Sequence, residues 1–263
     1  MSKKLTIAEL IQLKGKRQIA LTTAFNGWTA QAAEAAGVDM VVTWGTSLEV
    51  TRSLVAEVRK AAPNTLIGTG LPMPEAYSSE ELAIRYATEL RRAGADIIYC
   101  SGLVPEKFAA MARQHIPCCG HVGYLPVNDT WLGGPRAVGK TAPEAKKMLD
   151  DTLALEAAGC IAVEMELVPA EVAAEITSRT KMLVFSMGSG PHCDGQFIFD
   201  CDILGTNSGH VPRHAPVYAN LMDEAVTAFS RYREDILNGD YPTPAHSVRM
   251  KPDERERFLA ALD

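Results

Sequence analysis

Residues 157–166 read Ala-Ala-Gly-Cys-Ile-Ala-Val-Glu-Met-Glu, in which a helical pattern ends at glycine and an apolar strand pattern follows at once. The same arrangement occurs at residues 35–39, Ala-Ala-Gly-Val-Asp, and at residues 93–96, Ala-Gly-Ala-Asp. Glycine is favoured just after a helix because it has no Cβ to clash in the left-handed conformation. We therefore expect three helices that end in glycine and lead directly into strands.

This unit belongs to a longer alternation of short β-rich apolar runs with helical patterns. The predicted strands are 19–23, 39–44, 65–70, 96–101, 117–122, 160–166, 182–187 and 202–205. The predicted helices are 30–36, 54–62, 79–93, 105–115, 143–158, 170–179 and 215–237. Eight strands with right-handed crossovers favour an α/β fold, a closed parallel (β/α)8 TIM barrel, over an open doubly wound sheet.

No linker or internal repeat beyond this unit divides the chain, so residues 1–263 are interpreted as a single barrel domain with extra helices at both ends. The chain closes with a charged segment and the short apolar run Phe258-Leu-Ala-Ala-Leu262. We expect this tail to form a terminal helix that packs on the barrel or on a neighbouring subunit.

The composition excludes several classes of partner. The 263 residues include 26 Lys and Arg against 32 Asp and Glu, a net charge of -6, so the basic surface that nucleic acids and anionic membranes attract is missing. No apolar run approaches the roughly 18 residues of a membrane span, and the N-terminus is amphipathic. The six cysteines lack paired C-x-x-C spacing, which indicates reduced thiols. These features predict a cytoplasmic protein with a small-molecule partner.

Glu164 and Glu166 are the most informative polar pair, because parallel barrels place their active sites at the C-terminal ends of the strands. Residues i and i+2 share a strand face, which puts the two carboxylates roughly 6 to 7 Å apart. At an effective dielectric constant of about 20 their repulsion is about 2.4 kcal/mol. Two ionised glutamates in one cavity therefore need a cation, a hydrogen-bonding partner or a shared proton. The alternative is that both side chains point outward between barrel and helices.

Other strand ends supply further candidates. His121 ends the fifth predicted strand, with a buried core histidine as the alternative interpretation. The adjacent Cys118 and Cys119 point to opposite faces, so they do not form a metal site with it. The glycine-rich residues 188–190 and 194–196 resemble the anion-binding turn that often follows strand seven. The residues expected to contact the substrate are Trp44, Thr46, Ser47, Tyr99, Ser101 and Glu164.

Taken in order, the motifs of this chain resemble those of the ketopantoate hydroxymethyltransferase family, a barrel family of the phosphoenolpyruvate mutase and isocitrate lyase superfamily. The resemblance runs from residue 5 to residue 247. It rests on residues 22–25 (Thr-Thr-Ala-Phe), 34–39 (Glu-Ala-Ala-Gly-Val-Asp), 45–48 (Gly-Thr-Ser-Leu), 61–64 (Ala-Ala-Pro-Asn), 71–72 (Leu-Pro), 92–95 (Arg-Ala-Gly-Ala), 119–123 (Cys-Gly-His-Val-Gly), 155–159 (Leu-Glu-Ala-Ala-Gly), 166–170 (Glu-Leu-Val-Pro-Ala), 194–196 (Asp-Gly-Gln) and 209–213 (Gly-His-Val-Pro-Arg).

The resemblance implies the family's reaction. A base removes a proton from the β-carbon of 2-oxoisovalerate, and the enolate adds to the methylene carbon of 5,10-methylenetetrahydrofolate while a divalent metal chelates the 2-oxo acid. By match to the family motifs, Glu166 is the implied general base, His121 contacts the substrate and Ser47 binds its carboxylate. The family forms large homo-oligomers, so a homo-oligomer is expected.

The metal-binding pattern of the family is not repeated. The family's first and second metal-binding aspartates, its lysine and its glutamate correspond here to Thr46, Gly70, Tyr99 and Ser101, in that order. The loop that closes over the substrate in the family is shortened to residues 48–52. Because Mg²⁺ prefers several anionic oxygen ligands, its affinity is expected to collapse. Glu164 would restore one carboxylate from a different strand, or would itself act as a second acid or base.

Three functions remain open at this point. The first is a hydroxymethyltransferase-like enzyme that forms a carbon-carbon bond on a 2-oxo acid or related carboxylate. The second is a carbon-carbon lyase or hydrolase with Cys100 as nucleophile or acid, although a buried structural thiol is the simpler interpretation of Cys100. The third is a catalytically degenerate, small-molecule-binding barrel. Missing metal ligands favour the third function, whereas the retained Glu166, His121 and Ser47 argue against it.

Overall fold

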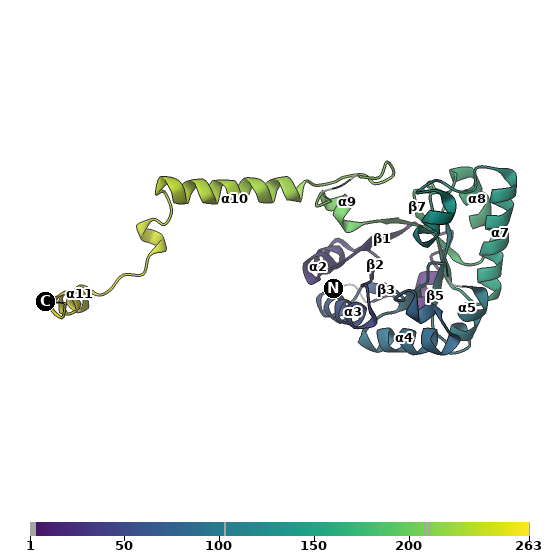
Figure 1. Cartoon of the computed structure of the whole chain (residues 1–263), viewed down its shortest axis with the longest axis horizontal. Coiled ribbons are helices and arrows are strands. Elements are labelled where there is room, and N and C mark those ends of the chain that lie inside the picture. The colour runs from purple at the N-terminus through teal and green to yellow at the C-terminus, as the bar shows by residue number, and fades with distance from the viewer. Residues whose placement is uncertain (1–3, 103, 208, 210, 263) are drawn as a thin grey trace.

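The computed structural model describes residues 4–102, 104–207, 209 and 211–262 (Figure 1). Eight parallel strands close into a barrel in sequence order, which confirms the predicted (β/α)8 fold. The strands are β1 Ile19–Thr23, β2 Met40–Thr43, β3 Leu66–Gly70, β4 Ile97–Tyr99, β5 Cys118–Gly123, β6 Ala162–Glu166, β7 Leu183–Met187 and β8 Gly195–Ile198.

Helices surround the barrel and extend beyond it. They are α1 Ile7–Ile11, α2 Gly27–Ala36, α3 Leu48–Ala61, α4 Glu80–Ala93, α5 Pro105–Ala112, α6 Asp129–Leu132, α7 Ala142–Ala157, α8 Ala170–Arg179, α9 Asp200–Leu204, α10 Leu221–Asn238 and α11 Pro252–Ala260, with short 3-10 turns at Glu75–Tyr77, Pro126–Asn128 and Pro244–His246. The three glycines expected to end helices, Gly37, Gly94 and Gly159, all have positive φ angles.

Apolar side chains fill the barrel on both sides of its wall. Inside, residues such as Met40, Leu66 and Phe185 form one buried cluster, and Leu10 of α1 joins this cluster. Outside, a larger cluster lies between the strands β4 to β7 and the helices α4, α5, α7 and α8. The strands are therefore apolar on both faces, as parallel strands covered by helices require.

The eighth strand differs from the prediction. β8 is formed by Gly195–Ile198, whereas residues 202–205, predicted as the strand, lie in and directly after α9. Residues 188–194 connect β7 to β8 without a helix, so the alternation that identified the other strands fails at this point. Gly195 and Gln196, which resembled part of an anion-binding turn, instead begin β8. Asp194 is paired with Lys14 at 2.6 Å.

Helix α3 begins at Leu48, six residues before the predicted start at position 54. The hydroxyl of Ser47 accepts a hydrogen bond from the amide of Val50 and caps the helix. Residues 48–52, interpreted from the sequence as a shortened loop, are thus the first turn of α3. Helix α10 also differs, because it begins at Leu221 rather than at residue 215.

The C-terminal arm, residues 221–262, leaves the barrel. Figure 1 shows α10 and α11 extending away from the strands, and no described residue of this arm is buried. The prediction that the tail packs on its own barrel is therefore wrong. The alternative, packing on a neighbouring subunit, is not tested by a single chain.

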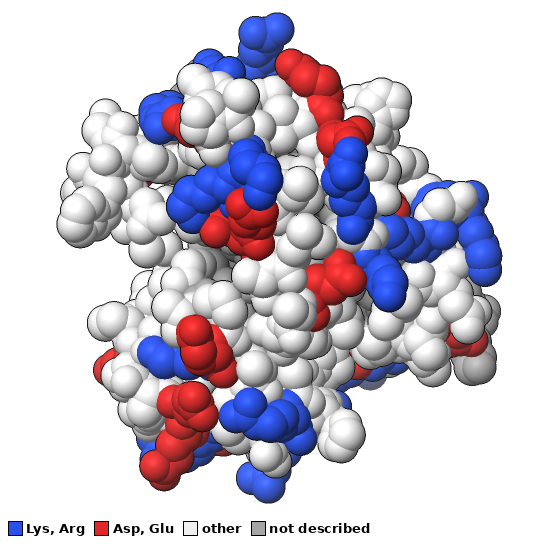
Figure 2. Space-filling view, turned by 90° about the vertical axis from the view of Figure 1, so that its right-hand side faces the viewer, with Lys and Arg blue, Asp and Glu red and all other residues white. Residues whose placement is uncertain are grey.

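The face of the molecule in Figure 2 shows no large basic patch, as the net negative charge of the sequence led us to expect. Figure 2 shows one face of the molecule, on which basic and acidic side chains are intermixed. On α7, Lys146 pairs with Asp150 and Lys147 with Asp151, one helical turn apart. No described helix is both long and apolar enough to cross a membrane.

Candidate active site

A cavity of about 520 Å³ lies at the C-terminal ends of the strands, where parallel barrels carry their active sites. Its walls are mostly apolar and aromatic, and the described lining residues include neither Lys nor Arg. The lining comprises Val42, Trp44, Gly45, Thr46, Gly70, Leu71, Pro72, Met73, Tyr77, Tyr99, Cys100, Ser101, His121, Pro126, Val127, Glu164, Glu166, Met187, Phe197 and Phe199.

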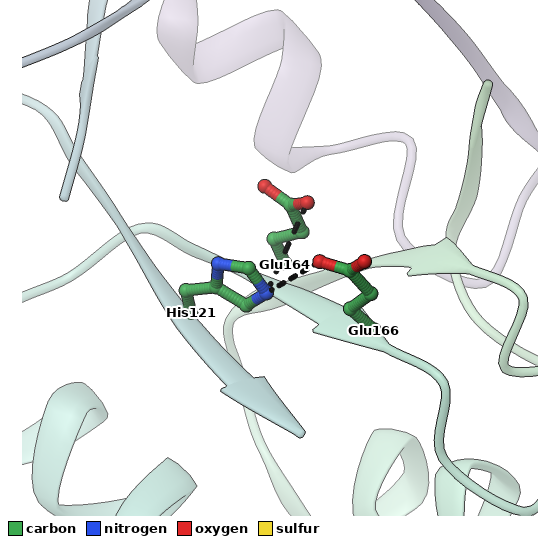
Figure 3. Close-up of side chains that lie close together, drawn as sticks. All are labelled: His121, Glu164 and Glu166. Carbon is green, nitrogen blue, oxygen red and sulfur yellow. Dashed lines mark ion pairs between the residues drawn. The ribbon is translucent and has the colours of Figure 1, made fainter. Parts of the chain in front are cut away.

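Three ionisable side chains converge in this chamber from β5 and β6 (Figure 3). His121 is the register partner of Glu164, and Glu166 follows two residues later on the same face of β6. His121 Nε2 lies 3.2 Å from Glu166 Oε2 and 4.0 Å from Glu164 Oε1. All three side chains are close to fully buried. Both glutamates therefore face the chamber, and the outward-facing alternative is excluded.

One donor atom from each of these residues lies within 4.8 Å of the other two. The two carboxylates approach each other more closely than the expected 6 to 7 Å, because both side chains lean toward the same imidazole. A group of one histidine and two glutamates at this spacing is able to hold a metal ion. The sequence prediction that the glutamates need a neutralising partner thus has a structural counterpart in His121.

The charges of the cluster depend on one another. Burial lowers the pKa of His121, but the negative charges of Glu164 and Glu166 outweigh that effect and leave its pKa raised. Burial also raises the pKa of Glu164; nearby His121 opposes this rise, and the charge of Glu166 adds to it. In the absence of another cation, the cluster therefore favours retention of a proton on the His121–Glu164 pair.

The two ring nitrogens of His121 have different surroundings. Ser101 Oγ lies 2.9 Å from Nδ1, within hydrogen-bond distance. The Nε2 atom is fully buried and makes no well-aligned hydrogen bond with any described residue, although Glu166 is 3.2 Å away. Buried ring nitrogens without an aligned partner are uncommon and indicate a place for a ligand, an ion or water.

Gly123 fixes the position of Glu166. It has a φ of +94°, and a Cβ added there would lie 2.2 Å from the backbone oxygen of Glu166. The same oxygen accepts a hydrogen bond of 2.8 Å from the amide of Tyr124. β5 can therefore approach the end of β6 only because residue 123 lacks a side chain.

The β2 and β3 side of the chamber is built differently. Trp44 follows β2 and packs against Phe25 and Phe199, with ring centroids 4.7 and 5.9 Å away. A Cβ added at Gly70 would meet Trp44 Cβ at 3.2 Å, which is a tight contact. The indole therefore occupies the space beside position 70. Thr46 contributes one hydroxyl to the lining.

Some of the remaining candidate residues line the chamber and others do not. Ser47 caps α3 and is not among the described lining residues. Tyr99 is buried, and its hydroxyl has no described hydrogen-bond partner. Cys100 lines the chamber, but burial raises the pKa of its thiol, which argues against a nucleophilic thiolate. His210, part of the motif at 209–213, lies outside the described residues.

Two chamber residues, Phe197 and Phe199, escaped the sequence analysis because β8 was placed too late in the chain. Both belong to the aromatic wall that also includes Trp44. The short aromatic and β-branched run Phe197-Ile198-Phe199, bounded by Gly195 and Asp200, is typical of a strand, and it would have indicated β8.

Comparison with known proteins agrees with this architecture. Residues 4–244 match the family described as ketopantoate hydroxymethyltransferase. The chain belongs to this family. A 3-methyl-2-oxobutanoate hydroxymethyltransferase of Kosmotoga olearia is 33% identical over 91% of this chain and 96% of its own length. The protein of that name from Pyrobaculum calidifontis is 34% identical over 93% and 98%. The family resemblance inferred from the motifs is thereby confirmed.

Solved structures of the same fold are more distant in sequence. A 2,3-dimethylmalate lyase, described as a phosphoenolpyruvate mutase and isocitrate lyase superfamily member, superposes with a TM-score of 0.57 at 13% identity and covers 98% of this chain and 99% of its own. A phosphonopyruvate hydrolase solved with oxalate and Mg²⁺ gives 0.56 at 14% identity, with the same coverage. These likenesses establish the barrel fold.

Proposed function

We propose that this protein transfers a hydroxymethyl group to an enolisable 2-oxo acid, with Glu166 as the general base. Family membership supports this proposal. The observation that carries it is the position of Glu166, a mostly buried carboxylate that lines a largely apolar chamber at the strand ends. Because the named relatives are 3-methyl-2-oxobutanoate hydroxymethyltransferases, the substrate would be that acid or a close analogue.

In the proposed reaction, Glu166 accepts the proton from the carbon next to the keto group. The electrons of that C–H bond form the enolate, and the enolate carbon bonds to the methylene carbon of the donor. Both carbon-nitrogen bonds of the donor's methylene carbon break, and water supplies the hydroxyl oxygen. The two nitrogens each take up one proton, one from Glu166 and one from that water. The donor would be 5,10-methylenetetrahydrofolate, as in the family. His121 would contact the substrate beside Glu166, and the apolar walls limit access of bulk water to the enolate.

The family's divalent metal does not fit its usual positions in this chain. Thr46 offers a hydroxyl, Gly70 offers no side chain, and Trp44 crowds the space where a larger residue at position 70 would lie. Hard cations bind through several oxygen ligands, preferably carboxylates. The proposed reaction therefore takes no step through a metal held by β2 and β3.

Hydrogen exchange tests the proposal directly. The protein is incubated with a panel of 2-oxo acids in deuterated water, and loss of the proton next to the keto group is followed by NMR. Because general-base catalysis contributes about 10²- to 10⁴-fold, Glu166→Gln should slow exchange by about 100-fold or more. Glu175→Gln, on the exposed face of α8, should exchange at the wild-type rate. Equal rates in the wild type and Glu166→Gln, or no exchange with any acid, would contradict the proposal.

We also propose that the protein is a homo-oligomer in which α10 covers the barrel of a second copy. Apolar residues recur on α10 at helical spacing and are about half or more exposed: Met222, Val226, Phe229, Tyr232 and Ile236. On the barrel, the outward-facing Gln196 and Ile198 of β8 are only partly covered. Phe229→Glu should therefore lower the molar mass measured by light scattering, and a monomeric wild-type protein would contradict this arrangement.

A further inference from the structure

The chamber contains few groups that can neutralise an anionic substrate. Its described lining has no Lys or Arg, and His121 is the one described lining side chain that can carry a positive charge at neutral pH. The described lining therefore holds two carboxyl groups and no permanent positive charge, so it offers little to offset the charge of a 2-oxo acid anion. A divalent cation bound at this cluster supplies the missing positive charge.

The donor atoms for such a cation already lie close together. His121 Nε2 and Glu164 Oε1 are 4.0 Å apart. Two metal–ligand bonds of about 2.1 Å span at most about 4.2 Å, so a small rotation of the Glu164 side chain lets one ion bind both atoms without movement of β5 or β6. The buried Nε2, which makes no well-aligned hydrogen bond with any described residue although Glu166 Oε2 is 3.2 Å away, is the independent sign of a ligand at this point. Ser101 Oγ, 2.9 Å from Nδ1, would accept a hydrogen bond from the Nδ1–H group, which leaves the Nε2 lone pair free for the ion.

We propose that Glu164 and His121 bind one divalent transition-metal cation, such as Mn²⁺ or Co²⁺, on the β5–β6 side of the chamber. The carboxylates missing at positions 46 and 70 are replaced in this arrangement by a carboxylate from β6 and an imidazole from β5. An imidazole ligand favours transition metals over Mg²⁺, which prefers an all-oxygen set. The binding of substrate at the open positions of the ion rests on the proposed function, whereas binding of the ion itself does not.

The position of Glu166 is compatible with this site. Glu166 Oε2 is the carboxylate oxygen closest to His121 Nε2, at 3.2 Å. A cation that binds Nε2 from the side of Glu164 would leave no N–H at that nitrogen, so the imidazole would no longer hold Glu166 through a hydrogen bond. Glu166 is then free to accept a proton from the substrate, which is the state that a general base requires.

Calorimetric titration of the full chain, freed of metal with a chelator, tests the inference without substrate. We expect one Mn²⁺ site per chain, and weaker binding of Mg²⁺. Glu164→Gln keeps the side-chain volume and removes the anionic ligand, so Mn²⁺ affinity should fall by about 100-fold. Glu175→Gln, an exposed carboxylate on α8, is the matched control and should bind Mn²⁺ as the wild type does.

A second variant guards against misfolding. His121→Gln should remove the nitrogen-dependent part of the visible Co²⁺ spectrum, and circular dichroism reports whether each variant is folded. The inference is overturned by a wild type that binds no Mn²⁺, by unchanged affinity in folded Glu164→Gln, or by preference for Mg²⁺. Metal binding without Glu166-dependent exchange would overturn only the proposed function, and such exchange without metal binding would overturn only this inference.

Discussion

The two sides of the chamber differ in the chemistry of their side chains. The β5–β6 side carries His121, Glu164 and Glu166, all three close to fully buried and within a few ångströms of one another. The β2–β3 side carries a hydroxyl, a glycine and the indole of Trp44, which give the cavity its shape. Reactive groups are therefore concentrated on one strand pair, and the opposite wall contributes packing.

Gly123→Ala should damage the β5–β6 side most. The added Cβ would lie 2.2 Å from the backbone oxygen of Glu166, in a residue whose φ is already +94°. Strain and overpacking together should lower the free energy of unfolding by about 3 kcal/mol or more, measured by urea denaturation. In any folded fraction, Glu166-dependent hydrogen exchange should fall as well.

Gly133→Ala is the matched control for this replacement. Gly133 has a similar φ of +75°, but a Cβ there would meet nothing within 4 Å. Its cost should be the conformational strain alone, about 1 to 2 kcal/mol. Equal losses of stability in the two variants would show that close approach of β5 to β6 is not what requires glycine at position 123.

Alkaline pH should destabilise the β4–β6 side through its buried thiols. Cys118 is fully buried, and burial raises its pKa to about 12. Because the folded-state pKa lies above the unfolded value of about 8.5, the stabilisation is complete below pH 8.5 and is lost as the pH rises toward 12. Between these two pKa values, each such thiol lowers the free energy of unfolding by up to about 1.4 kcal/mol for every pH unit.

Urea denaturation at several alkaline pH values measures this slope. Cys118→Ala should make it shallower by the contribution of one thiol, whatever its effect on stability at neutral pH. Cys201→Ala provides the comparison, because Cys201 is only partly buried and should change the slope less. Identical slopes in the wild type and Cys118→Ala would mean that this thiol ionises as easily in the folded as in the unfolded protein.

The smallest effect is expected on the β2–β3 side. Thr43 and Thr69 are register neighbours, fully buried, and their hydroxyls have no described hydrogen-bond partner. Replacing either by the isosteric Val removes an unsatisfied polar group and should raise the unfolding free energy by about 1 kcal/mol. Thr177→Val should have the opposite effect, because that buried hydroxyl donates to the Ala173 carbonyl at 2.7 Å. Destabilisation by Thr43→Val would reveal a missing partner for its hydroxyl.

Much of this fold could be predicted from sequence because three of its eight strands follow a helix that ends in glycine and because apolar runs alternate with helical patterns as far as β7. The unit at 157–166 appears in the structure as the end of α7, the glycine and β6. β8 was misplaced because no helix separates it from β7, so the periodic signal was lost. The arm could not be placed, since an apolar helix face indicates burial without indicating in which molecule.

Within the site, the period of a strand correctly placed Glu164 and Glu166 on one face. The contact of both with His121 depends on the register between β5 and β6, which the sequence did not reveal. The capping function of Ser47 also required coordinates, because the same residue type suits a helix start and a substrate contact. The contact of Trp44 with position 70 also could not be predicted, because it depends on how side chains from two separate strands pack together.

The hydrogen-bonded register between β5 and β6 must form correctly during folding before the site can act. His121, Glu164 and Glu166 share one register, so a slip of β6 by a single residue would turn both glutamates toward the helices and bring Val163 and Met165 inside. Catalytic activity therefore depends on a single alignment of two strands. During refolding, a collapsed barrel in which β5 and β6 pair in the wrong register is expected to be inactive. The rate at which enzymatic activity returns then measures how fast β5 and β6 reach the correct register.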